Sequence, residues 1–180
     1  MFGRLSKPKQ IEIPEKLNEL FEKHKEELDV LSNMSIRYYS VDISSFDNDS
    51  KDSDEKLAKS IIESSEVSET FQELLFKFID SKNLNEVEVY KKAYIDRRLF
   101  SRIKSNKNYH PSFGTITLLA LSMKLSTEEF EELLKSASYS LPTNMHSRLI
   151  LRYCFDNKIY DINTVNNLIF SVTRKEIKFL

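Results

Sequence analysis

The chain contains only two glycines and four prolines among its 180 residues, and this scarcity limits its fold more than any other feature of the sequence. An all-β protein needs a turn every few residues, and tight turns depend on these two residue types. Phosphate-binding loops also depend on closely spaced glycines. The composition therefore predicts a mostly all-α fold, and it argues against most nucleotide-cradling loops.

The pattern of residues changes along the chain and predicts two regions. Residues 1–53 would form an N-terminal arm or a small dimerising or docking element. It would contain an amphipathic helix over 15–31, a short extended segment at 34–43 and an acidic linker rich in Ser and Asp from residue 44. Residues 54–180 carry apolar residues at three- and four-residue spacings almost to the end, which predicts a helical domain.

Short polar side chains precede the apolar runs of the helical domain, where they can accept hydrogen bonds from the first free amides of a helix. After a first helix over 54–66, we expect the later helices to have as their N-caps Ser68, Asn85, Asp96, Ser112, Ser126 and Asp161. Ser126 is followed three residues later by Glu129, which predicts a capping box.

Basic residues are concentrated in one short segment, although the net charge of the whole chain is only -1. Between Tyr90 and His110, seven cations stand against the single anion Asp96, a local net charge of +6, so the remainder of the chain sums to -7. A basic patch on an otherwise acidic body can direct binding to a polyanion even when the total charge is near zero.

The same segment has the pattern of two helices joined by a short connection. We expect the two helices within residues 85–95 and 96–106, where about three residues near 94–96 form the connection between them. The expected inward residues are Val89, Ala93, Ile95, Phe100 and Ile103, with Leu99 partly inward. The second helix then presents outward, in positions suited to base edges or phosphates, Arg97, Arg98, Ser101 and Arg102. The remaining cations would contact phosphates: Lys91, Lys92, Lys104 and Lys107. The N-terminus of the second helix would add partial positive charge.

Residues 68–138 resemble the lambda-repressor-like (Cro/C1, or XRE-type) helix-turn-helix domain. Leu84 precedes the first helix of the motif, and FSRIKSNK (100–107) stands where that family has Ile-Ser-Arg-Ile-Glu-Asn-Gly-Lys. PSFGTITLLALSMKLS (111–126) stands where the family has Pro-Ser, a leucine-rich helix and a short loop. The resemblance implies a five-helix core with extra C-terminal helices, in a DNA-binding bacterial or phage transcriptional regulator.

The chain is also similar to an uncharacterised module found at the C-termini of various bacterial proteins. Two segments carry this similarity, VYKKAYIDRRLFSRI (89–103) and IYDINTVNNLIF (159–170), and it extends the match to about residue 172. The similarity implies no particular activity.

Two positions depart from the helix-turn-helix pattern. Tyr94 stands at the turn, where the family usually has Gly, and Glu86 stands where it often has a phosphate-binding Gln. A tyrosine is uncomfortable in a left-handed turn, and a carboxylate repels phosphate. These departures favour an alternative in which the same fold serves as a non-catalytic adaptor that binds a protein partner in a stress or phage-defence system.

Other functions find little support in the sequence. There is no nucleophile elbow, no HExxH motif and no cluster of residues at metal-ligand spacing, so we expect neither an enzyme nor a metal or other cofactor. No run of 18 apolar residues and no signal-peptide pattern is present, and the single cysteine, Cys154, lies in an apolar run as a structural thiol. The expectation is a cytoplasmic protein that does not enter membranes. Its partner would be DNA, with RNA as an alternative, and a homodimer would suit two symmetric half-sites.

Overall fold

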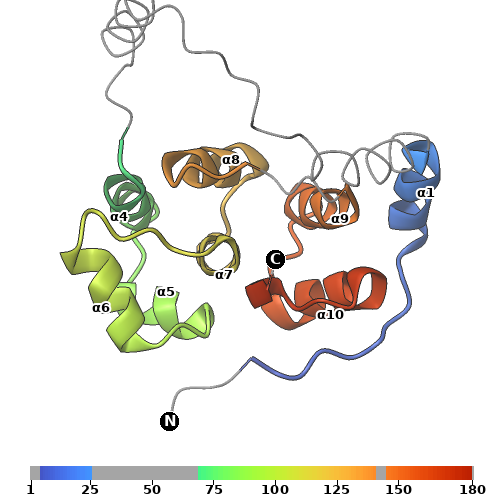
Figure 1. Ribbon diagram of the computed structural model, residues 1–180, viewed down its shortest axis with the longest axis horizontal. Helices are drawn as coiled ribbons and strands as arrows, with labels where there is room; N and C mark the ends of the chain where they lie inside the picture. Colours follow the sequence, from blue (N-terminus) through green and yellow to red (C-terminus); the bar gives the residue numbers. More distant parts are fainter. Residues whose placement is uncertain (1–4, 26–68, 141–144, 180) are drawn as a thin grey trace, which may run out of the picture.

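The computed structural model describes residues 5–25, 69–140 and 145–179, and all regular structure in these residues is helical (Figure 1). The elements are α1 (Glu15–Lys23), α4 (Phe71–Ser81), α5 (Glu86–Lys92), α6 (Arg97–Ser105), α7 (Phe113–Ser122), α8 (Thr127–Ser136), α9 (Met145–Asp156), α10 (Ile162–Thr173) and the short 3-10 helix η3 (Ile177–Phe179). The predicted mostly all-α fold is confirmed for this part of the chain. The extended segment predicted at 34–43, the acidic linker, the helix over 54–66 and the boundary at residue 53 lie outside the described residues.

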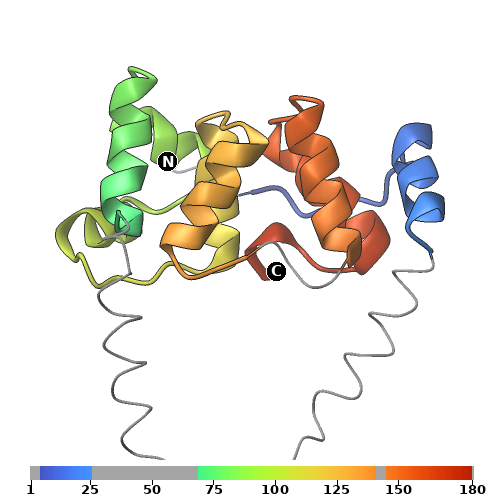
Figure 2. The same ribbon diagram turned by 90° about the horizontal axis from the view of Figure 1, so that it is seen from above.

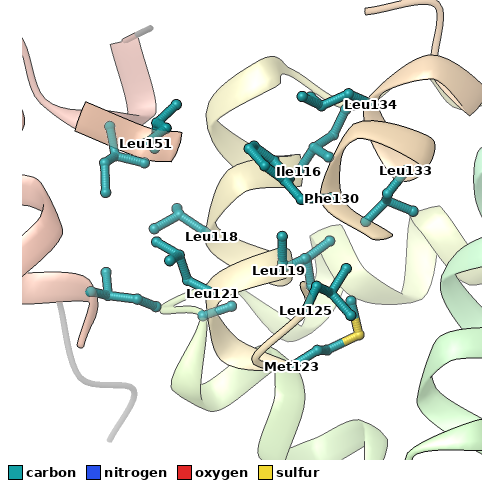
Figure 3. Close-up of a cluster of buried hydrophobic side chains, with 14 of the residues drawn as sticks. Ile116, Leu118, Leu119, Leu121, Met123, Leu125, Phe130, Leu133, Leu134 and Leu151 are labelled. Carbon is teal, nitrogen blue, oxygen red and sulfur yellow. The ribbon is translucent and has the colours of Figure 1, made fainter. Parts of the chain in front are cut away.

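Helix α7 lies at the centre of the molecule (Figure 1). It packs against α5 and α8 on one side and against α10 and η3 on the other. Eight of its ten residues are buried, so it has no solvent-facing stripe, as expected of a helix that neighbours cover all round. Its leucines meet side chains of α8 and of α9, which include Phe130, Leu133 and Leu151 (Figure 3).

The helices follow one another along the long axis of the molecule (Figure 2). Helices α4, α5 and α6 lie at one end, α7 and α8 lie in the middle, and α9, α10 and α1 lie at the other end (Figure 1). A single core of buried apolar residues runs through all of them, from Leu17 in α1 to Ile177 in η3. The N-terminal element therefore packs into the same body as the C-terminal helices.

Three of the helix connections have the same four-residue design. Each has a C-cap residue, a residue with left-handed backbone, a buried or half-buried apolar residue and the N-cap of the next helix; their sequences are KNLN (82–85), AYID (93–96) and MKLS (123–126). In the first, the amide of Leu84 donates to the carbonyl of Ile79 and that of Asn83 to the carbonyl of Asp80, the paired bonds of a Schellman motif. The chain thus makes tight turns without glycine, at positive φ angles of 49° at Asn83, 55° at Tyr94 and 53° at Lys124.

The expected N-caps are present with one exception. Asn85, Asp96, Ser112 and Asp161 each accept a hydrogen bond from a first-turn amide, and Ser126 forms the predicted capping box with Glu129. The prediction of Ser68 as the cap of α4 is wrong. Thr70 caps that helix, because Glu73 lies three residues after Thr70 and completes a capping box with it.

The segment before α1 runs along α10 (Figure 1) and is hydrogen-bonded to it. The amide of Lys9 donates to Oδ1 of Asn167 at 2.8 Å, and the amide of Ile11 donates to Oγ of Ser171 at 2.9 Å. Helix α1 then packs on α9 and buries Leu17 completely. These hydrogen bonds satisfy the amides of a segment that has no regular structure of its own.

Gly114 lets η3 approach the backbone of α7. A β-carbon at this position would lie 2.5 Å from the carbonyl oxygen of Ile177 and 2.7 Å from Cα of Lys178, both of them backbone atoms. The close approach buries Ile177 completely, and the amide of Ile177 donates to Oδ1 of Asn166 at 2.9 Å. The glycine is required here for space, because a side chain would push the C-terminal segment away.

We predict that Gly114→Ala lowers the free energy of unfolding by about 1–2 kcal/mol. Losing the burial of Ile177 costs roughly 1.5–3 kcal/mol, whereas alanine in a helix gains only about 1 kcal/mol over glycine. Chemical denaturation monitored by circular dichroism measures the change. Ile177→Ala is the partner variant: it should destabilise the native chain but have little further effect in the Gly114→Ala background. Additive effects of the two substitutions would contradict this account.

A second prediction concerns the left-handed residues. Ser138, at φ 58° and exposed after α8, occupies a conformation in which glycine avoids the steric cost of a β-carbon. Ser138→Gly should raise the free energy of unfolding by about 0.5 kcal/mol. The matched control is Ser136→Gly, two residues earlier inside α8, where glycine should lower it by a similar amount. Equal effects of the two substitutions in a denaturation experiment would refute the role assigned to Ser138.

Candidate nucleic-acid interface

Helix α6 is anchored by an aromatic cluster on its inner side. The ring of Phe100 lies 5.3 Å from that of Tyr90 in α5 and 6.0 Å from that of Phe76 in α4, measured between centroids. Phe100 and Ile103 are buried and Leu99 is half-buried, as the spacing predicts. The helix is therefore held by one face, and its opposite face is free to carry polar residues.

That opposite face carries four of the predicted site residues. Arg97, Arg98, Ser101 and Arg102, here called the α6 arginine face, are all exposed. None of the three guanidinium groups forms an ion pair with an acidic residue in the described part of the chain. Three positive charges thus lie on a rigid helix without a neutralising partner among these residues.

The predicted lysines behave differently from the arginines. Nζ of Lys104 lies 2.6 and 2.9 Å from the two carboxylate oxygens of Glu86 and also 5.4 Å from the centre of the Phe76 ring. Lys107 pairs with Glu73 at 3.4 Å, and Lys92 pairs with Glu88 at 3.2 Å, one helical turn away. All these pairs are exposed, so each contributes little to stability and exchanges readily with another anion.

The ion pair between Glu86 and Lys104 bears on the position at which the chain has Glu where the helix-turn-helix family often has Gln. Glu86 on its own would repel a phosphate, but its charge is balanced by the ammonium group of Lys104. The pKa of Glu73 in α4 is lowered, chiefly by hydrogen bonds from the backbone and hydroxyl of Thr70 and then by Lys107. Each of these two carboxylates thus has a lysine of the basic segment as its partner, Lys104 for Glu86 and Lys107 for Glu73.

The N-terminus of α6 is already occupied by a carboxylate. Oδ1 of Asp96 accepts a hydrogen bond from the amide of Arg98 at 2.7 Å. The expectation that this helix end attracts a phosphate is weakened, because Asp96 uses one free amide and places its own negative charge there. Contacts with an anion at α6 must therefore come from the side chains.

Tyr94 ties the connection between α5 and α6 to the C-terminal helices. Its φ of 55° is the left-handed conformation that the sequence suggested would be uncomfortable for a tyrosine. Its hydroxyl oxygen accepts a hydrogen bond from Nδ2 of Asn163 in α10 at 3.2 Å, and the ring is half-buried. The side chain thus makes a contact that glycine could not make, which offsets the cost of the backbone conformation.

Lys91 and Lys92 line a pocket of about 610 Å³ between α5, α7 and the connection from α9 to α10. Two further lysines that sequence reasoning missed, Lys124 and Lys158, line the same pocket. We call it the lysine pocket; its walls are completed by Tyr94, Leu121, Ser122, Tyr160, Asp161 and Ile162. The only sequence signal for Lys124 and Lys158 is that each follows a helix, and nothing in the sequence indicates that these helix ends meet.

Other kinds of site are not found in the described residues. No group of three or more His, Cys, Asp or Glu there could hold a metal ion. Among the described helices, none has the length and apolar character needed to cross a membrane. No protein-family model, curated protein or solved structure matches the chain.

Cys154 should be unreactive in the folded protein. It is fully buried in α9, and burial raises the pKa of its thiol to about 12. Since the thiolate is the nucleophile, the native chain should react very slowly with a thiol reagent at pH 8, and the denatured chain should react fast. Absorbance of the released thiophenolate measures both rates. Rapid stoichiometric reaction of the native chain would contradict the placement of Cys154.

Proposed function

We propose that this chain is a DNA-binding helix-turn-helix protein of the lambda-repressor-like kind, acting as a transcriptional regulator in the cytoplasm of a bacterium or on behalf of a phage. The observation that carries the proposal is the α6 arginine face, whose three guanidinium groups have no ion-pair partner among the described residues and lie on a helix that follows α5 after a four-residue connection. The order of five short helices, α4 to α8, also supports it. The proposed role is binding, without catalysis.

The chemistry of the α6 arginine face suits the major groove of DNA. A guanidinium group donates two parallel hydrogen bonds, either to the O6 and N7 atoms of guanine or to a phosphate. Arg98 and Arg102 are one helical turn apart, and so are Arg97 and Ser101, so two adjacent rows of side chains point outward. Such a helix reaches base edges with one row while the other contacts the backbone.

The surrounding lysines would supply phosphate contacts. Lys91 has no ion-pair partner in the described residues, and Lys92, Lys104 and Lys107 each have an exposed carboxylate partner. A surface ion pair contributes about 0–1 kcal/mol, so replacing the carboxylate with a phosphate costs little. Release of counterions from DNA then favours binding at low salt.

A protein-binding adaptor is the second candidate function. Val87, near the start of α5, is the one large apolar side chain in the described part of the chain that is strongly exposed, at 43%. It follows Glu86 in the chain, and Glu86 forms an ion pair with Lys104. Mixed charge around an exposed apolar residue suits a protein partner better than a uniformly anionic polymer.

We predict that the chain binds duplex DNA in a salt-dependent way through α6. Fluorescence anisotropy with random-sequence duplex DNA and with RNA, at about 50 and 200 mM salt, measures the affinity. Substituting Arg97, Arg98 and Arg102 together by alanine should remove most binding. Substituting by alanine any single arginine that contacts a base should cost roughly 1–3 kcal/mol of binding free energy and relax the sequence preference.

The matched control removes the same charge elsewhere. Lys16, Lys23 and Lys135 are exposed and have no ion pair among the described residues, and their triple alanine variant should keep most of the affinity. Equal losses in the two triple variants would mean that only net charge matters. Absence of binding at low salt would refute the DNA proposal, and salt-insensitive binding of a protein partner, lost in Val87→Lys, would support the adaptor.

A further inference from the structure

The lysine pocket lies where the ends of four helices meet. Three of them are C-terminal ends: Lys91 and Lys92 close α5, Lys124 follows α7, and Lys158 follows α9. The fourth is the start of α10, which contributes Asp161. The proposed DNA contacts of Lys91 and Lys92 do not account for a concave site that brings in Lys124, Lys158 and Tyr160 from elsewhere in the chain.

The charge of the pocket is strongly positive. Four lysines and a single acidic side chain line the pocket, and Asp161 accepts hydrogen bonds from the amide and hydroxyl of Thr164 within α10, at 2.8 and 2.7 Å. Only Lys92 has an ion-pair partner among the described residues, the exposed Glu88. Ammonium groups that line one pocket repel one another, and an anion that lies between them is stabilised.

Lysine at a helix C-terminus is ordinary, because it complements the helix dipole. That reason explains Lys91 and Lys92 in the last turn of α5. It does not explain why Lys124 and Lys158 occupy left-handed positions, with φ of 53° and 56°, where glycine or asparagine is less strained. Tyr94 occupies the third such position in the pocket. Three of the ten lining residues thus keep a long side chain at a strained backbone position.

The pocket also offers aromatic and apolar surface. Tyr94 and Tyr160 are half-buried, and Leu121 and Ile162 are buried beside them. The hydrogen bond from Asn163 to the Tyr94 hydroxyl holds that ring in place. A planar ring can stack on a tyrosine fixed in this way, and stacking does not depend on the identity of the ring.

We propose that the lysine pocket binds a nucleotide, with the phosphates among Lys91, Lys124 and Lys158 and the base against Tyr94 or Tyr160. A volume of about 610 Å³ is that of a small-molecule site. The duplex backbone is a convex ridge and fits a concave pocket of this size less well. Because the lysines supply the charge, the site does not need the glycine-rich loop that this chain lacks.

The test uses the full chain and a fluorescent ATP analogue labelled on the ribose. Anisotropy should show saturable binding, and unlabelled ATP and tripolyphosphate should compete for the site while adenosine competes poorly. Lys124→Glu/Lys158→Glu should weaken binding by roughly tenfold or more, the effect of losing a charge-assisted contact. Tyr160→Ala should weaken ATP much more than tripolyphosphate.

The matched control is Lys16→Glu/Lys135→Glu, which makes the same change of charge at exposed lysines outside the pocket and should leave ATP affinity within about twofold. Circular dichroism checks the fold of each variant. If the Lys124→Glu/Lys158→Glu variant does not fold, Lys124→Gln/Lys158→Gln is measured in its place. Absence of saturable binding, or an equal loss in the control, would overturn the proposal. The proposal would also be overturned if single-stranded DNA displaced the analogue and ATP did not.

The outcome is separable from that of the DNA proposal. Neither Lys124 nor Lys158 belongs to the α6 arginine face, so their substitution should weaken ATP binding and leave a large part of DNA binding intact. The triple alanine variant of α6 should do the reverse. Loss of both activities in both variants would show a single anion-binding surface and would refute a separate nucleotide site.

Discussion

The burial of eight of the ten residues of α7 is the constraint on which the rest of the structure depends. A helix that is apolar all round must be covered on every side, and here α5 and α8 cover one side while α10 and η3 cover the other. The C-terminal segment can approach only because position 114 has no side chain. The two groups of helices are thereby joined across one helix, and α6, which anchors through Phe100 and Ile103, is left at the edge with its charged side outward.

The connections between helices decide which side chains lie in the core and which lie on the surface at the helix ends. Each of the repeated turns places one apolar residue inward, such as Ile95 or Leu125, and one left-handed residue beside it. At two of these turns, and in the connection from α9 to α10, the left-handed position carries a long side chain in place of glycine: Tyr94, Lys124 and Lys158. Packing of α5 and α10 near the end of α7 then brings three such turns together around one pocket. A feature that is local in origin, a turn made without glycine, becomes a site only through the tertiary arrangement.

Those features of the structure that depend on neighbours in sequence could be predicted from the sequence. The caps at Asn85, Asp96 and Asp161 and the inward positions of Phe100 and Ile103 follow from local hydrogen bonding and helical spacing. Even among these local features, the prediction of the N-cap of α4 was wrong. Thr70 and not Ser68 caps the helix, because Thr70 has a glutamate three residues later. Contacts over long separations were not predictable: Lys104 meets a carboxylate 18 residues away and Lys107 one that is 34 residues away.

These long-range ion pairs divide the cations of the basic segment into two groups, those with and those without a carboxylate partner among the described residues. Counted along the sequence, its seven cations look equivalent, but Lys104 and Lys107 have carboxylate partners from α5 and α4, and Lys92 has one from its own helix. Lys91 and Lys92 line the lysine pocket, and the arginines of α6 are exposed as a group without ion-pair partners among the described residues. An exposed ion pair costs about 0–1 kcal/mol to break, so the lysines pay a small cost on binding a new anion that the three arginines do not. The binding proposed for the segment therefore depends less on its net charge of +6 than on which of its charges have no partner among the described residues.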